Sequence, residues 1–419
     1  MRKPKINEVP PIEPAVGDTI TQTREYKLIT PLFGGGVTPG EADPVTVVRG
    51  AEIRGQLRFW WRACRAGQFG GDLGRMKALE DQLWGAASTA KRPRPSQVQI
   101  AVEVVSGGKA DSPFEVGRSK KGDPQIRPRQ GSVVPAYAAF PLQPTQEEAS
   151  IGMQTKSVRV GVRFILTISF PIDRRREVEA ALWAWETFGG IGARTRRGFG
   201  ALQCMRMNSQ DVLAPPCNQA KQRINEALKR FVAEGRWPED VPHLRQTMGT
   251  QLRITTADRS PVAAWDYLIR KLQAFRQARD GKYGPSLWPE PNAIRSLTQG
   301  RVAGERPLIK KFPRAQFGLP IIFHFAHGGE PGDTTLKGPG GLERIASPLI
   351  LRPLACADGA VGLALILQTP SIASEKLELE EKDKKSPHSV DASLTSKEAT
   401  QIPPLGGKTD VLKVFLDTL

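Results

Sequence analysis

The chain has 419 residues and carries 60 Lys and Arg against 43 Asp and Glu, which gives a formal net charge of +17. A positive excess of this size favours nucleic acid, an anionic membrane surface or an acidic protein as the partner. No apolar run approaches the roughly 18 residues that a membrane-spanning helix needs, and the charged, proline-rich N-terminus lacks the apolar core of a signal peptide, so we expect a cytoplasmic protein with no membrane partner.

The four cysteines and four histidines are scattered along the chain and show no spacing typical of a metal site or a disulfide framework. We therefore expect reduced thiols, no metal and no cofactor. A chain of this length should hold two domains, which we place at residues 1–210 and 211–419.

The first predicted elements are a strand at residues 25–31, the glycine run TPLFGGG at residues 30–36 and a helix at residues 51–65. One face of this helix is a row of guanidinium groups, because positions three and four apart lie on the same side. The row consists of Arg54, Arg58, Arg62 and Arg65. The opposite face is an apolar stripe that would dock on a sheet and leave the arginines outward. The stripe consists of Ile53, Leu57, Trp60 and Cys64.

Like charges at this spacing weaken a helix by about 0.2 to 0.5 kcal/mol per pair, so a polyanion such as RNA is the natural partner of the row. The alternative is a solvated face with ordinary ion pairs. Only Glu52 is acidic in this segment, which weakens that alternative. Trp61 falls within the row, where it could stack on a base or be buried by a neighbouring segment.

The rest of the first half predicts a helix near residues 76–84, strands at 98–105 and 160–170, a helix at 177–188 and a strand at 201–207. This order is β-α-β-β-α-β, the split βαβ pattern of the ferredoxin-like fold. The insertion at residues 106–159 is rich in Gly, Pro, Lys and Arg. We interpret it as a mobile basic loop that could touch RNA or a neighbouring subunit.

A second glycine-rich segment, GGIGARTRRGFG, occupies residues 189–200 between the last helix and strand. Its five glycines permit positive φ and close backbone approach, while Arg194, Arg196 and Arg197 add charge. It is not a P-loop, because no GKS or GKT follows, and its helix-to-strand order is opposite to that of a Rossmann fingerprint.

The motifs TPLFGGG, RGAEIRGQLRFWWRA and GGIGARTRRGFG together resemble the RAMP superfamily of CRISPR RNA-binding proteins, and specifically the first subunit of the type III-B Cmr effector complex. The resemblance spans about residues 25–205 and recurs in FGLP at 317–320 and RIASPLILRP at 344–353. It implies an α+β fold with two ferredoxin-like (RRM-like) β-α-β-β-α-β domains and insertions.

The resemblance also implies a function. The family subunit looks non-catalytic, sits with other RAMP subunits at the 3′ end of the guide RNA, and helps capture target RNA in antiviral defence. Guide RNA, target RNA and the other Cmr subunits would then be the partners. The expected RNA-contacting residues are Gly34, Gly35, Gly36, Arg54, Arg58, Trp61, Arg62, Arg65, Arg194, Arg196 and Arg197.

The second half departs from a tidy copy of the first. Helices are predicted at residues 218–233 and 262–279, and short strands at 320–325, 348–354 and 361–367. The basic segment IKKFPR at 309–314 and Lys337 could extend an RNA path or form a solvated surface. Residues 371–400 are charged and predict a flexible linker, followed by a terminal helix at 408–419.

Three functions remain open from the sequence: a non-catalytic RNA-binding subunit, a metal-independent RAMP endoribonuclease, and a scaffold for an acidic protein. A nuclease needs a histidine or an equivalent base near the 2′-hydroxyl, and no histidine lies in either arginine-glycine segment. Metal-dependent cleavage would need clustered carboxylates, whereas Glu52 stands alone in its helix. We therefore expect no catalytic residues.

Overall fold

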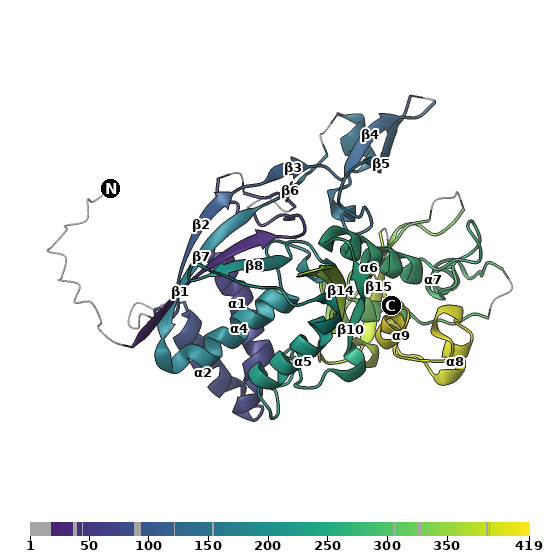
Figure 1. The fold of residues 1–419 in the computed structure, drawn as a ribbon. Coiled ribbons are helices and arrows are strands. Elements are labelled where there is room, and N and C mark those ends of the chain that lie inside the picture. The colour runs from purple at the N-terminus through teal and green to yellow at the C-terminus, as the bar shows by residue number, and fades with distance from the viewer. Residues whose placement is uncertain are drawn as a thin grey trace, which may run out of the picture.

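The chain folds into an α+β structure with several antiparallel sheets (Figure 1). The computed structural model describes residues 18–36, 40–43, 45–87, 94–120, 122–152, 155–304, 307–325, 329–382, 384 and 386–419.

The first half is built on a five-stranded antiparallel sheet with the strand order β2-β7-β1-β8-β9. Its strands are β1 (Thr19–Leu28), β2 (Gln99–Ser106), β7 (Arg163–Pro171), β8 (Leu202–Met207) and β9 (Gln210–Asp211). The helices of this half are α1 (Gly50–Arg65), α2 (Leu73–Trp84) and α4 (Arg175–Phe188). The predicted β-α-β-β-α-β order of the main elements is therefore found here.

Strand β1 begins at Thr19, earlier than predicted, because its first inward-facing residues are polar. Gln22 and Arg24 are buried, and the Arg24 guanidinium pairs with the Glu186 carboxylate of α4 at 2.8 Å. The partner of Arg24 lies on a helix far away in the sequence, so the polar residues at the start of β1 form no local pattern that predicts a strand.

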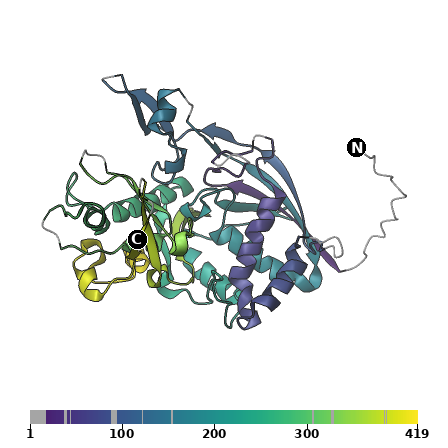
Figure 2. The same cartoon turned by 180° about the vertical axis from the view of Figure 1, so that it is seen from behind.

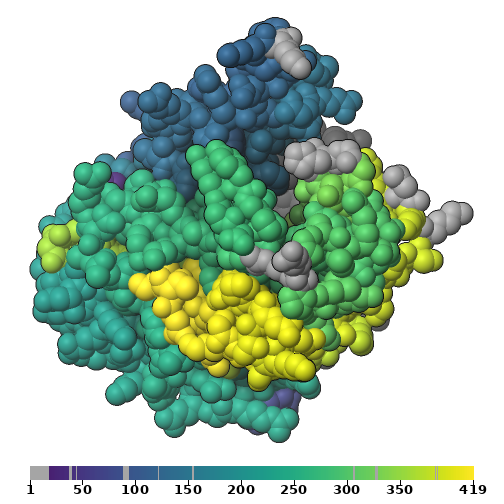
Figure 3. All heavy atoms as spheres, turned by 90° about the vertical axis from the view of Figure 1, so that its right-hand side faces the viewer, coloured from purple at the N-terminus to yellow at the C-terminus, as the bar shows by residue number. Residues whose placement is uncertain are grey.

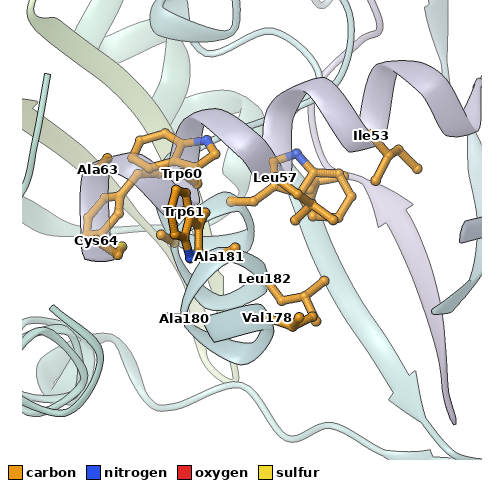
Figure 4. Packing of buried hydrophobic residues seen from close by; sticks show 14 of the residues in the cluster. Ile53, Leu57, Trp60, Trp61, Ala63, Cys64, Val178, Ala180, Ala181 and Leu182 are labelled. Atoms are coloured by element: carbon orange, nitrogen blue, oxygen red, sulfur yellow. The ribbon is translucent and has the colours of Figure 1, made fainter. Parts of the chain in front are cut away.

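Helices α1, α2 and α4 cover one face of the first sheet, as the purple and teal helices show in Figure 2. Helix α1 docks through the predicted apolar stripe, in which Ile53, Leu57 and Cys64 are fully buried and Trp60 nearly so. The stripe packs against small and branched side chains of α4, including Ala181 and Leu182 (Figure 4). The predicted orientation of this apolar face is confirmed.

The insertion is more ordered than the predicted mobile loop. It forms β3 (Lys109–Asp111), β4 (Phe114–Arg118), β5 (Pro124–Pro128), α3 (Gln146–Ser150) and β6 (Val158–Val160). The β4–β5 hairpin projects from the body of the molecule (Figure 1). Buried Phe114 and the contact of Arg129 with Asp111 hold its base, so apolar and paired residues hidden among the charges explain the difference.

The second half contains a three-stranded sheet with the order β10-β14-β13, covered by helix α6 (Pro261–Arg276). The strands are β10 (Leu252–Asp258), β13 (Leu349–Cys356) and β14 (Gly359–Ile366), and α5 (Ala220–Phe231) links this unit to the first half. Strand β10 was not predicted. Over the residues that the structure describes, this sheet has one strand fewer than a complete second β-α-β-β-α-β copy requires.

A four-stranded sheet, β11-β12-β15-β16, completes the second half. It consists of β11 (Ile321–Phe323), β12 (Thr334–Lys337), β15 (Lys376–Glu381) and β16 (His388–Asp391), and α7 (Glu290–Gln299) packs on it. Helix α8 (Ser396–Thr400) and the expected terminal helix α9 (Val411–Asp417) belong to the buried cluster of α6. The prediction of a flexible linker at 371–400 is therefore wrong. Leu377 and Leu379 alternate with charges and are fully buried, a strand pattern that the high charge concealed.

The two halves share apolar packing. One buried cluster contains Trp185 of the first half and Leu363 of the second, and the Phe199 and Trp265 rings meet edge to face at 4.9 Å. A domain boundary near residue 210 stays a prediction.

Candidate nucleic-acid interface

The two predicted glycine loops lie against each other. The Ala193 amide donates to the Phe33 carbonyl at 2.7 Å, and the Gly200 amide donates to the Pro31 carbonyl at 2.9 Å. At Gly192, where φ is 83°, an added Cβ would lie 2.5 Å from the Phe33 carbonyl oxygen. Because no side chain fits there, the contact between the loops depends on glycine.

The glycine run at residues 34–36 is held by its neighbours. Gly34 and Gly35 have left-handed φ values of 63° and 96°, and the Gly36 amide donates to the Glu41 carbonyl at 2.8 Å. Arg49, at the start of α1, donates to the Gly35 carbonyl. These contacts fix one rim of the candidate interface.

Glu52 of α1 connects the helix to the second glycine loop. One of its carboxylate oxygens accepts the Gly192 amide, while the other, Oε2, is buried and has no hydrogen-bond partner among the described residues. Burial raises the pKa of the Glu52 carboxyl above its ordinary value, against the opposing effects of the Gly192 amide and Arg49.

The arginine row of α1 is neutralised from within the protein. Arg58 and Arg62 both bind the Glu80 carboxylate of α2, with 2.9 Å between Arg58 Nε and Glu80 Oε1. Glu80 is only 2% exposed. Arg54 donates to the Trp84 carbonyl at 3.3 Å. The three arginines are half-buried, so RNA binding by Arg54, Arg58 and Arg62 stays a prediction.

Two residues of the row do not face outward as predicted. Arg65 is 5% exposed and pairs with Glu177 of α4 at 2.9 Å. Trp61 is fully buried and donates its indole N–H to the other oxygen of Glu177 at 2.7 Å. Glu177 lies on α4, which is far from α1 in the sequence but packs against it. Of the two alternatives for Trp61, the structure shows burial.

Two arginines of the second glycine loop connect the halves of the protein. Arg196 donates to the Ser347 carbonyl, and Arg197 donates to the Phe317 and Leu349 carbonyls at 3.3 and 3.2 Å. Burial, with added repulsion from neighbouring arginines, lowers the pKa of Arg197 to about 9. These acceptors belong to the FGLP and RIASPLILRP motifs, and Glu52 of RGAEIRGQLRFWWRA binds the same glycine loop, so all the motifs meet around it.

Arg352 of β13 also connects the two halves of the protein, a role that was not predicted from the sequence. Its guanidinium is fully buried and donates to the Gly189 carbonyl at 2.6 Å and to the Leu202 carbonyl at 3.0 Å. Burial lowers the pKa of Arg352 to about 9. A lone arginine inside the apolar run LILRPL was the available signal, because a buried cation requires dedicated acceptors.

Arg194 is the loop arginine with different surroundings. It has a left-handed φ of 57°, and the nearest cation is Arg276 at the end of α6. Arg276 Nη1 donates to the Tyr137 hydroxyl of the insertion at 3.2 Å. Neither Arg194 nor Arg276 has a carboxylate partner among the residues that the structure describes. No local sequence pattern indicated that Arg276 and Tyr137 belong to this place.

Lys311, Arg314 and Lys337, three cations of the second half that could have extended an RNA path, are paired. Lys311 contacts Asp391 at 3.1 Å, Arg314 contacts Glu290 at 3.1 Å, and Lys337 contacts Glu380 at 2.8 Å. These pairs favour the solvated-surface alternative over an extended path.

The described histidines have structural partners. His243 stacks on Trp237 with 4.5 Å between ring centroids, His324 binds Asp333 at 2.6 Å, and His388 binds Glu381 at 2.8 Å. His327 lies outside the described residues. In the described part of the chain, no group of three or more His, Cys, Asp or Glu could hold a metal, and no helix is long and apolar enough to cross a membrane.

Comparison with known proteins shows what this part of the chain resembles. Residues 25–203 match the model of the RAMP superfamily. Over 164 residues the chain is 29% identical to CRISPR system Cmr subunit Cmr1-1 of Pyrococcus furiosus. This alignment covers 39% of this chain and 42% of that protein. Over 182 residues it is 27% identical to Cmr subunit Cmr1-2 of the same organism, and this alignment covers 43% of this chain and 92% of that protein.

The fold is also similar to a chain in the cryo-EM structure of the type III-B Cmr-β bound to cognate target RNA and AMPPNP in the presence of single-stranded DNA. The TM-score is 0.51 at 12% identity, and the alignment covers 96% of this chain and 98% of that chain. At this low sequence identity, the match shows a similarity of fold.

Both interlocked glycine loops and helix α1 lie within the residues that match the RAMP superfamily model. The curated relatives that the chain matches are Cmr1 subunits, so the predicted resemblance to the first Cmr subunit is confirmed. The alignment spans less than half the length of Cmr1-1.

Proposed function

We propose that this protein is a non-catalytic RNA-binding subunit of a type III-B CRISPR Cmr complex. It sits at the 3′ end of the guide RNA, beside other RAMP subunits, and helps capture target RNA. Two findings support this proposal: the matched relatives are Cmr1 subunits, and the Cmr-β assembly that contains the similar chain is bound to cognate target RNA.

The observation that carries the proposal is the pair of interlocked glycine loops beside an arginine without a carboxylate partner among the described residues. Loops of this kind offer backbone amides and close approach, and a guanidinium recognises phosphate geometry without reading bases. Arg194 supplies such a guanidinium from the second glycine loop, whose residue Ala193 donates its amide to Phe33 of the first loop. Guide binding should therefore tolerate many sequences.

We also propose that both halves descend from ferredoxin-like units. In the first sheet, β8-β1-β7-β2 places the fourth, first, third and second strands of the β-α-β-β-α-β unit side by side. In the second, β10, β14 and β13 would be the first, third and second strands of a shortened unit.

The absence of catalysis is supported by the surroundings of the histidines. His324 and His388 bind carboxylates in the β11–β16 sheet, and His243 stacks on Trp237. A general base must reach the proton that it removes, and the glycine loops carry no histidine in their sequences. Gly34, Gly35, Gly36, Arg54, Arg58 and Arg62 remain proposed RNA contacts beside Arg194.

The experiment that tests this function is reconstitution of a Cmr complex around this chain, with a guide RNA carrying photoreactive nucleotides at known positions. We expect crosslinks from this chain to the 3′ part of the guide and to bound target RNA, and intact RNA on gels with or without magnesium. Crosslinks confined to the 5′ part would contradict the proposed position, and cleavage by the isolated chain would favour the nuclease alternative.

A further inference from the structure

One place in the molecule concentrates positive charge without an opposing carboxylate among the described residues. Arg194 from the second glycine loop, Arg276 from α6 and Tyr137 from the insertion come together there, three segments far apart in the sequence. In the described part of the chain, the Nε atoms of both arginines are buried and have no hydrogen-bond partner.

The charge balance at this place is unfavourable in the protein alone. Burial lowers the pKa of Arg194, and repulsion from Arg276 lowers it further, while Tyr137 raises it slightly. Two guanidiniums held together in a partly dry site repel each other, and a buried donor without an acceptor costs about 1 to 3 kcal/mol. Elsewhere this protein neutralises grouped arginines with buried carboxylates such as Glu80 and Glu177.

The neighbours hold these side chains in place. The Arg276 guanidinium lies 5.5 Å from the centre of the Phe317 ring, and its backbone carbonyl accepts from Arg314 Nη1 at 3.0 Å. Tyr137 accepts a hydrogen bond from Arg276, so its own hydroxyl hydrogen remains able to donate. The group therefore presents only donors to an incoming ligand.

We propose that Arg194, Arg276 and Tyr137 form a clamp for one backbone phosphate of single-stranded RNA. A phosphate accepts several charge-assisted hydrogen bonds at once, and its negative charge would oppose the positive charges of both guanidiniums. This proposal rests on the proposed function, and it adds that the insertion and the second half bind RNA together with the glycine loop.

The position of the clamp fits a strand that crosses between parts of the protein. The insertion, blue in Figure 3, sits directly over the green helices of the second half. The Arg276–Tyr137 hydrogen bond spans this boundary, and Arg194 reaches it from the first half. An RNA strand held here would contact all three parts, which explains why the insertion is folded and anchored.

The test compares binding of a labelled single-stranded RNA by the full chain across a sodium chloride series. The variants are Arg276→Gln, Arg194→Gln and Tyr137→Phe. Arg270→Gln is the matched control, because Arg270 lies on the same helix, is exposed and pairs with Asp266 at 2.7 Å. Loss of one charge-assisted contact should weaken binding about tenfold or more, and loss of the hydroxyl by about fivefold. The salt slope of log affinity should fall by about 0.7 for each arginine.

Melting curves provide a second readout that separates a ligand site from a structural one. Without RNA, Arg194→Gln should not lower the melting temperature, because the change removes repulsion. Arg276→Gln also removes repulsion but loses the contacts with Phe317 and Tyr137, so Arg194→Gln is the more informative variant in this readout. Inorganic phosphate, added at an ionic strength matched with chloride, should raise the melting temperature of the wild-type chain less than RNA does. It should leave the melting temperature of the variant that combines Arg194→Gln with Arg276→Gln unchanged. Stabilisation by phosphate equal to that by RNA would instead indicate a site for small phosphates and overturn the clamp for RNA.

The outcomes separate this proposal from the proposed function. If the wild-type chain binds RNA and Arg276→Gln binds it equally well with an unchanged slope, the clamp is wrong and the RNA-binding function stands. If the wild-type chain neither binds RNA nor crosslinks to it in the complex, the function itself fails. A lower melting temperature of both arginine variants without RNA would make the cluster structural and overturn the clamp.

Discussion

Helix α1 and the second glycine loop both carry several arginines, but their opposing charges come from different sources. Most arginines of the α1 row meet carboxylates inside the protein, since Glu80 binds Arg58 and Arg62, and Glu177 binds Arg65. Arg54 donates to the Trp84 carbonyl instead. The loop arginines meet main-chain carbonyls or, in the case of Arg194, no described acceptor for Nε. The same residue type thus stabilises the fold in one region and leaves charge for a ligand in the other.

A row of arginines therefore indicates an RNA site only after its counter-charges are known. A cation whose carboxylate partner is buried contributes little to the external field, because the pair is nearly neutral. Arg194 and Arg276 have no carboxylate partner among the described residues, so their positive charges contribute to the external electrostatic field. They lie where three segments of the chain meet.

The largest effect should come from removing the counter-charge of α1. In Glu177→Gln the buried Arg65 loses its carboxylate, and we expect the free energy of unfolding to fall by about 3 to 5 kcal/mol in urea denaturation. Glu179→Gln is the control, because Glu179 pairs with exposed Arg175, and a surface pair contributes about 1 kcal/mol or less. Equal losses in the two variants would remove the distinction between buried and surface pairs.

A smaller effect is expected from Arg58→Ala combined with Arg62→Ala. These changes leave Glu80 buried with only Lys77 at 3.8 Å among the described cations, and should cost about 2 to 4 kcal/mol of stability. Adding Glu80→Gln should recover part of this loss. If Arg58 and Arg62 contact RNA as proposed, the salt slope of RNA binding should fall by about 1.4, whereas an unchanged slope would show that these two arginines do not contact RNA.

The smallest effect concerns pH and Glu52, the carboxylate between the two regions. Its pKa is raised by burial in the folded chain, so its contribution to stability is present at low pH and is lost as the pH rises through that raised value. Glu52→Gln keeps an acceptor for the Gly192 amide without a charge. Relative to the wild type, this variant should gain less than about 1 kcal/mol as the pH rises from about 4 to 8.

Urea denaturation at a series of pH values measures this difference. A constant difference between Glu52→Gln and the wild type across the range would mean that the Glu52 carboxyl keeps its ordinary pKa. The expected direction of the shift would then be wrong, and the contact with Gly192 would have no electrostatic cost.

Local patterns predicted much of the fold. The period of Ile53, Leu57, Trp60 and Cys64 predicted the buried face of α1, and the order of apolar runs predicted the β-α-β-β-α-β arrangement of the first half. The β15 strand was missed although Leu377 and Leu379 alternate, because the surrounding charge favoured disorder.

The candidate site was predictable only in part. The glycine loops follow from composition, whereas the partners of their neighbours do not follow from local sequence. Glu177 is 112 positions from Arg65, and Tyr137 is 139 positions from Arg276. Long-range charge pairing depends on the completed fold, so periodicity alone assigned Arg65 to the wrong environment and could not decide between the two alternatives for Trp61.

The joint between the halves bears on how such a protein can change over time. Arg196, Arg197 and Arg352 donate to main-chain carbonyls of the opposite half, and a carbonyl is present whatever side chain its residue carries. Substitutions on the receiving segments can therefore accumulate without removing an acceptor. The hydrogen bonds of the joint thus constrain three donor positions and the path of the backbone, and the side chains along that path are constrained only by their own packing.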